Sequence, residues 1–220
     1  MSRSQKNKIV YLFGAGATQA ELDNVDPTLK EKGLGLLIKD VSRRVIEKAS
    51  RVGSYVKDVE MVSATSGSLN IELLISLLEN SKMYGWENKT QLLKSLVKKD
   101  IESILPESRT KHFYLHRALF EFHKSKRKKH NEKLFGLISL NYDDVLDQAY
   151  EQYYGQPNYC FSLGQGTPSK RVPLLKLHGS FNWSKQEIRG RDRTIEIIPL
   201  GSNKTYLHAP YPFVFATIGR

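Results

Sequence analysis

The sequence has a single cysteine, Cys160, and no long apolar run. One cysteine cannot form a disulfide within the chain, and it excludes the cysteine-based zinc sites, which use two or more cysteines. Residues 9–13 are the first apolar segment, which is too short for the core of a signal peptide. No later segment approaches the roughly 20 apolar residues of a membrane span. We therefore expect a cytoplasmic protein with no metal site and no membrane contact.

Positive charge predominates, because 34 Lys and Arg residues stand against 23 Asp and Glu residues, a formal net charge of +11. Much of this charge lies in residues 123–133, H-K-S-K-R-K-K-H-N-E-K, between two apolar segments. The run contains no Phe, Tyr or Trp on which bases would stack. We interpret it as a solvated loop joining a helix to a strand. Binding of nucleic acid or an acidic partner is the alternative.

Apolar residues at helical spacing predict that the chain from Leu34 to His123 is mostly helical. The predicted helices span residues 34–48, 69–79, 91–104 and 109–123. Ser68 and Thr90 are the expected N-terminal caps of the second and third helices, and Pro106 is expected to end the third.

Runs of branched and aromatic residues predict buried strands. Three such strands are expected over residues 9–13, 134–140 and 172–177, and an alternating pattern predicts a fourth over 193–200. Asp143 or Asp144 is expected to begin a helix after the second strand. Because strands alternate with helices, we expect an α/β fold with a parallel sheet.

Three of the predicted strands end in a polar or glycine-containing motif. These motifs are Gly14-Ala15-Gly16, Asn141-Tyr142-Asp143 and His178-Gly179-Ser180. Ligands of open α/β sheets bind outside the carboxyl ends of the strands. We therefore expect all three motifs to face one crevice.

The glycine motif suits a phosphate group. Glycines after a strand let the backbone turn tightly and approach a pyrophosphate, while the following helix offers unpaired N–H groups. The alternative is that Gly14 and Gly16 only make a turn.

The other two motifs carry side chains suited to binding and catalysis. Asn141 can donate and accept hydrogen bonds, as a ribose hydroxyl or a water requires. Asp143 can accept from an amide N–H, and His178 is a natural general base near neutral pH. Taken alone, these residues are better explained as a turn, a helix cap and a structural histidine.

The three motifs together carry a family resemblance. G-A-G-A-T, L-N-Y-D-D and K-L-H-G-S-F-N-W follow successive strands in the order typical of the sirtuin-like domain. The sequence resembles this family from about Ile9 to Phe213, and it is most similar to the zinc-free bacterial branch found in antiphage defence proteins. The resemblance implies a Rossmann-like parallel sheet with a helical insertion subdomain. It implies one domain over residues 1–220, with a core of about 1–30 and 134–220 and an insertion of about 31–133.

The resemblance also assigns the site position by position. Residues matching the family's phosphate-binding positions are Gly14, Ala15, Gly16, Thr18, Gly179 and Ser180. Asn141 matches the asparagine that orients the ribose or the attacking water, and Asp143 the acid that recognises the nicotinamide amide. His178 matches the catalytic histidine.

The activity implied by this resemblance is hydrolysis of the nicotinamide–ribose bond of NAD, in an NAD-depleting effector of antiphage defence. NAD is then the substrate, and a homo-oligomer or a partner protein is expected. An NAD-dependent protein deacylase is one alternative, although the zinc cysteines that support its acyl-lysine groove are missing. A non-catalytic module that binds NAD or ADP-ribose is the other.

The sequence departs from the family's pattern in two further places. The proline-aspartate-phenylalanine-arginine segment of true sirtuins is missing after the glycine motif, where Asp26-Pro27 is only a faint counterpart. The chain also ends at Arg220, before the family's last strand and helix, so we expect a domain that is incomplete at its C-terminus.

Overall fold

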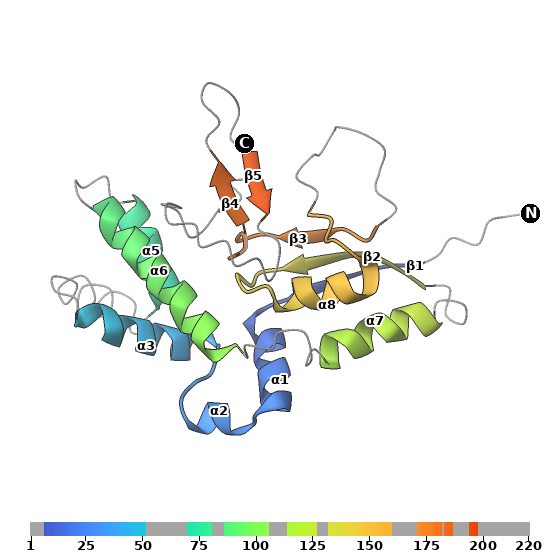
Figure 1. The fold of residues 1–220 in the computed structure, drawn as a ribbon, viewed down its shortest axis with the longest axis horizontal. Helices are drawn as coiled ribbons and strands as arrows, with labels where there is room; N and C mark the ends of the chain where they lie inside the picture. The colour runs from blue at the N-terminus through green and yellow to red at the C-terminus, as the bar shows by residue number, and fades with distance from the viewer. Residues whose placement is uncertain are drawn as a thin grey trace, which may run out of the picture. The chain divides into compact units, whose positions relative to one another are not determined.

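The computed structural model describes residues 7–51, 70–80, 86–105, 114–126, 132–159, 171–181, 183–186 and 194–197. The chain divides into two compact units, whose elements are labelled in Figure 1. The sheet unit contains β1 (Asn7–Phe13), α1 (Ala15–Val25), α7 (Tyr114–Lys126), β2 (Glu132–Ser139), α8 (Val145–Tyr154) and β3 (Leu174–Lys176). The helical unit contains α2 (Thr28–Glu31), α3 (Ile38–Ser50), α5 (Ile71–Asn80), α6 (Trp86–Ile104), β4 (Trp183–Gln186) and β5 (Thr194–Ile197).

The sheet unit is built on three parallel strands in the order β1-β2-β3. The register pairs Phe13 with Ser139 and Ser139 with Lys176, so the last residues of the three strands lie side by side. The prediction of an α/β fold with a parallel sheet is confirmed. α8 begins at Val145, directly after the predicted Asp143-Asp144 pair, and the Val145 N–H donates to the Asp143 carboxylate at 3.0 Å.

α7 and α8 pack against each other along one face of this sheet (Figure 1). The Tyr11 hydroxyl of β1 is hydrogen-bonded to His123 Nε2 of α7 at 2.7 Å, and the Phe13 ring stacks on His116. Phe120 and Tyr150 are fully buried and meet edge to face between the two helices. This packing fixes the face of β1 that carries Tyr11 and Phe13.

The prediction that β1 is fully buried is wrong. Val10 and Leu12 lie on the other face of the strand and are 49% and 65% exposed. Successive side chains of a strand point to opposite faces, and an all-apolar run is buried on both faces only where both are covered. The apolar run therefore predicted the strand correctly but overestimated its burial.

α3, α5 and α6 pack together in the helical unit. Their shared core is apolar, with Val45, Ala49, Ile71, Leu74 and Leu93 almost completely buried. α5 starts at Ile71, whose N–H donates to the Ser42 hydroxyl at 3.0 Å. The side-chain oxygen of Asn70 accepts from the N–H groups of Glu72 and Leu73. Asn70 is therefore the N-terminal cap of α5, in place of the predicted Ser68.

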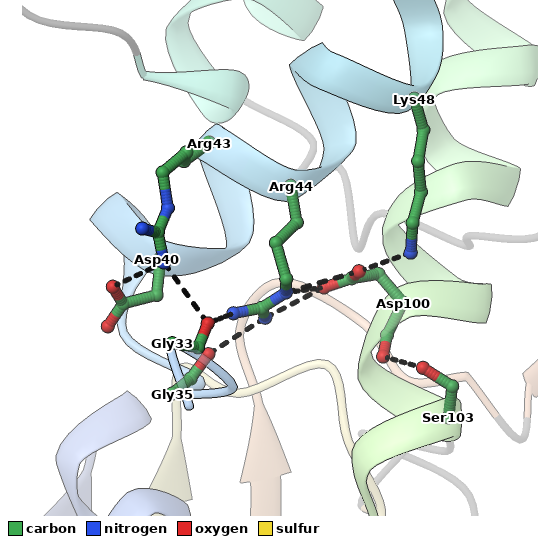
Figure 2. A network of polar contacts seen from close by, with 8 residues as sticks. All are labelled: Gly33, Gly35, Asp40, Arg43, Arg44, Lys48, Asp100 and Ser103. Atoms are coloured by element: carbon green, nitrogen blue, oxygen red, sulfur yellow. Dashed lines mark hydrogen bonds and ion pairs between the residues drawn. The ribbon is translucent and has the colours of Figure 1, made fainter. Parts of the chain in front are cut away.

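Asp100 of α6 is the centre of a charged network in this unit (Figure 2). Its carboxylate accepts from the Arg44 guanidinium at 2.8 Å and from Lys48 Nζ at 2.6 Å. Arg44 also donates to the carbonyls of Gly33 and Gly35. Asp100 is only 1% exposed, and two cations of α3 supply its counter-charge, the mostly buried Arg44 and the half-exposed Lys48.

Several element boundaries differ from the predictions. α6 begins at Trp86, so Thr90 is a buried helix residue and not the predicted cap. α7 continues to Lys126, so the basic run starts on a helix and not in a loop. The fourth predicted strand is present as β5, but it pairs antiparallel with β4 in a separate sheet. Residues 68, 69, 106, 109–113, 127–131, 193 and 198–200, which also entered the predictions, lie outside the described part of the chain.

Candidate functional site

The three motifs leave the sheet at the same edge, because the strands that precede them are parallel and end in one row. Gly14 follows β1 directly, Asn141 lies two residues after β2, and His178 lies two residues after β3. The carboxyl edge of a parallel sheet is where α/β proteins bind their ligands.

The glycine motif makes an immediate transition from β1 to α1, and the Ala17 N–H donates to the Gly14 carbonyl at 2.9 Å. A Cβ atom placed on Gly14 or Gly16 would meet nothing within 4 Å, and neither residue has the positive φ that favours glycine. Packing and backbone conformation therefore give no reason for glycine at these positions. Ala15 and Gly16 are exposed, so the open space lies at the surface.

Thr18, Asn141 and Asp143 form one hydrogen-bonded cluster. The Asn141 side-chain amide donates to the Thr18 hydroxyl at 2.9 Å and to the Gly14 carbonyl at 3.0 Å. The Thr18 hydroxyl in turn donates to Asp143 Oδ2 at 3.0 Å. The structure thus brings together residues of the first two motifs, which are more than 120 residues apart along the chain.

Asp143 is almost completely buried at 7% exposure. Burial raises the pKa of its carboxyl above the ordinary value of 3.8. The positive charge of Lys176 and the hydrogen bonds from Val145 and Thr18 oppose this rise without cancelling it. Asp143 is therefore easier to protonate than an exposed aspartate.

Lys176 is a buried residue of this region that was not predicted from the sequence. Its side chain is fully buried, and Nζ donates to Asp147 Oδ2 at 2.9 Å, to the Ser180 hydroxyl at 2.7 Å and to the Asp143 carbonyl at 2.5 Å. The available signal was a lysine inside the otherwise apolar run of residues 174–177. A lysine at such a position is buried only where it finds a partner.

The third motif is divided between exposed and buried residues. His178 is exposed, and its ring lies against the Tyr142 ring with centroids 5.7 Å apart. Gly179 has a φ of 82°, which other residues rarely adopt. Ser180 is fully buried, and its hydroxyl accepts from Lys176 and donates to the Tyr142 carbonyl. The predicted phosphate-binding role of Ser180 thus competes with bonds that it already makes.

A second buried polar pair lies one helical turn beyond Thr18. Glu21 Oε1 accepts from the backbone N–H of His116 at 2.7 Å and contacts His116 Nδ1 at 2.5 Å. Both side chains are nearly inaccessible, at 4% and 3% exposure. His116 stacks on Phe13, and its bond to Glu21 also ties α7 to α1.

No protein-family model matches the chain, and no curated protein matches it significantly. Among the described residues, no group of three histidine, cysteine or acidic side chains is placed to hold a metal ion. None of the helices in the described ranges has the length and apolar character needed to cross a membrane.

Proposed function

We propose that the protein hydrolyses the bond between nicotinamide and ribose in NAD, releasing nicotinamide and ADP-ribose. The observation that carries the proposal is the cluster in which Asn141 holds both the Gly14 carbonyl and the Thr18 hydroxyl. It places an asparagine suited to a ribose or a water directly beside a glycine loop suited to a pyrophosphate. The sirtuin-like order of the three motifs supports the same assignment.

The glycine loop supports the nucleotide-binding half of the proposal. Gly14 and Gly16 have open space where a side chain would stand, although their own conformation does not require glycine. A pyrophosphate approaching the start of α1 explains that space, because it needs close access to backbone N–H groups. A parallel sheet with such a loop at its carboxyl edge also fits a Rossmann-like core.

For this reaction the protein must hold the ribose, hold the departing nicotinamide and activate a water. Nicotinamide leaves with the electron pair of the glycosidic bond, so its ring nitrogen becomes neutral and positive charge develops on the ribose. Asn141 would orient the ribose or the attacking water, and Asp143 would accept from the nicotinamide amide. His178 would take a proton from the water, as its exposure allows.

A non-catalytic module that binds NAD or ADP-ribose is a second candidate. It is favoured by the position of His178, whose ring contact is to Tyr142 and not to the buried cluster. The two candidates predict the same glycine-loop contacts and differ only in nicotinamide release. For the hydrolase, the proposed biological role is that of a cytoplasmic NAD-depleting effector. It would act as a homo-oligomer or with a partner protein.

The deciding experiment is incubation of the full chain with NAD, followed by chromatographic measurement of nicotinamide and ADP-ribose. The hydrolase is expected to release both in equal amounts, and an acetyl-lysine peptide should not accelerate release. His178→Ala should slow release by about 10²–10⁴-fold, the usual effect of removing an acid–base group, while NAD still binds. Binding of ADP-ribose without any nicotinamide release would reject the hydrolase in favour of the second candidate.

A further inference from the structure

Lys176 is buried at a position where a charged side chain is unfavourable. It shares the buried face of β3 with Leu174, and both residues have almost no exposure. Burial of an ammonium group carries a large desolvation cost, and an apolar residue of similar volume often stabilises a fold equally well. Stability alone therefore does not account for a lysine at this point of the strand.

The Lys176 ammonium has three donors, and each has an acceptor. Asp147 of α8 supplies the counter-charge at 2.9 Å and is itself fully buried. The Tyr159 hydroxyl donates to the other oxygen of Asp147 at 2.5 Å. The remaining two donors of Lys176 reach the Asp143 carbonyl and the Ser180 hydroxyl. The charge is thus balanced within the protein, and the ammonium is not held ready for a ligand.

Those last two bonds join the loop after β2 to the loop after β3. Asp143 belongs to the first loop and Ser180 to the second. Two weaker contacts follow the same path: the Ser180 hydroxyl donates to the Tyr142 carbonyl at 3.4 Å, and the His178 ring meets the Tyr142 ring. Lys176 contributes the two shortest bonds of this connection, since it reaches both loops directly.

We propose that Lys176 is a positioning residue for NAD cleavage, which holds the His178 loop at a fixed distance from Asn141 and Asp143. This inference rests on the proposed function. Lys176 does not touch the substrate, because its side chain is fully buried and its donors are occupied. Its loss should displace His178 relative to the ribose, and a displacement of about 1 Å can lower a rate by about 10²-fold.

The test is the double variant Lys176→Met/Asp147→Asn. It removes both charges of the buried pair together, so neither Lys176 nor Asp147 is left as an unpaired charge. The asparagine introduced by the second change still has a side-chain oxygen that can accept from the Tyr159 hydroxyl. We expect NAD affinity within about 3-fold of wild type and turnover lower by about 10²-fold. The nuclear Overhauser contact between the rings of Tyr142 and His178 should weaken in the same variant.

The matched control is Tyr159→Phe, which removes a hydrogen bond to Asp147 but leaves both loop contacts of Lys176 in place. It should keep wild-type turnover and the ring contact. Equal loss of rate in the control, or wild-type turnover and ring contact in the double variant, would overturn the positioning role. Absence of nicotinamide release from the wild-type protein would instead reject the proposed function. In that case the contact between the Tyr142 and His178 rings in the double variant still shows whether Lys176 holds the two loops together.

Discussion

The Asn141 side-chain amide donates to the Thr18 hydroxyl at 2.9 Å, across 123 residues of sequence. Its second N–H donates to the Gly14 carbonyl, so both of its donors serve the loop that follows β1. An asparagine used in this way shapes the glycine loop, and the proposed function gives it a second role at the ribose or the attacking water. Its substitution should therefore affect NAD affinity as well as turnover.

The first prediction concerns Asn141→Asp. The carboxylate has no N–H to donate, and its oxygen would face the Gly14 carbonyl oxygen. We expect the free energy of unfolding to fall by about 1–3 kcal/mol, the cost of an unsatisfied buried polar group, together with weaker NAD binding. Denaturant unfolding and calorimetric titration measure the two effects. Asn24→Asp, at an exposed position of α1, is the control and should change neither by a comparable amount.

The second prediction concerns Gly16→Val. The side chain would enter open space, so the fold should tolerate it, whereas a pyrophosphate at the start of α1 would meet it. We expect unfolding free energy within about 1 kcal/mol of wild type and strong loss of NAD affinity by calorimetry. Gly33→Ala is the contrasting variant, because Gly33 has a φ of 70° and its Cβ would meet Arg43. It should lose stability, and unchanged NAD affinity in folded Gly16→Val would remove the phosphate-loop assignment.

The sequence predicted the parallel strands and their polar ends well, because both signals are local. A short apolar run followed by Gly14 or by Asn141 marks where a strand stops, and the pairing of parallel strands then aligns the ends. The motifs that contain Asn141 and Gly14 were expected to face one crevice, but the hydrogen bond between Asn141 and Thr18 was not predicted. Which donor meets which acceptor depends on the register of β1 against β2, which no local pattern contains.

Ion pairs between buried side chains were the main feature that was not predicted from the sequence. Lys176 and Asp147 are 29 residues apart, and Arg44 and Asp100 are 56 apart, so periodicity within one element cannot pair them. Arg44 belongs to a helix that was predicted from its apolar residues alone, yet it bonds a buried carboxylate. β5 was assigned by its alternation alone, which does not indicate whether its partner strand is parallel or antiparallel.

The third prediction concerns Asp100→Asn. The change leaves Arg44, which is only 13% exposed, without its counter-charge, although its bonds to the Gly33 and Gly35 carbonyls remain. Breaking a buried ion pair in this way typically costs about 3–5 kcal/mol. Denaturant unfolding of the full chain should show a loss near the lower end of that range. Arg51→Ala breaks an exposed pair with Glu47 and should cost less than about 1 kcal/mol.

The fourth prediction is a pH dependence that comes from Glu21. Burial raises the pKa of its carboxyl, but the hydrogen bonds from His116 and the electrostatic interaction with that ring lower it more, so it lies below its ordinary value of 4.5. A lowered pKa stabilises the fold above pH 4.5, and this contribution is lost as the pH falls through the folded-state value. Glu21→Gln should be less stable than wild type at neutral pH. The difference should shrink on acidification, as unfolding measured at several pH values would show, and a constant difference would contradict the assignment.

The fifth prediction has the opposite sign and comes from Asp143. Burial raises the pKa of this carboxyl above 3.8, against the charge of Lys176 and the bonds from Val145 and Thr18. The folded state therefore holds its proton more tightly than the unfolded state, and the fold loses stability as the pH rises from 3.8 to the folded-state value. Asp143→Asn does not titrate, so its stability relative to wild type should increase across that window. Unfolding at several pH values measures the change, and a relative stability that falls with rising pH would show that the carboxylate is favoured by its surroundings. Nicotinamide release should remain low in this variant throughout, because an asparagine cannot replace both acceptor oxygens of the aspartate.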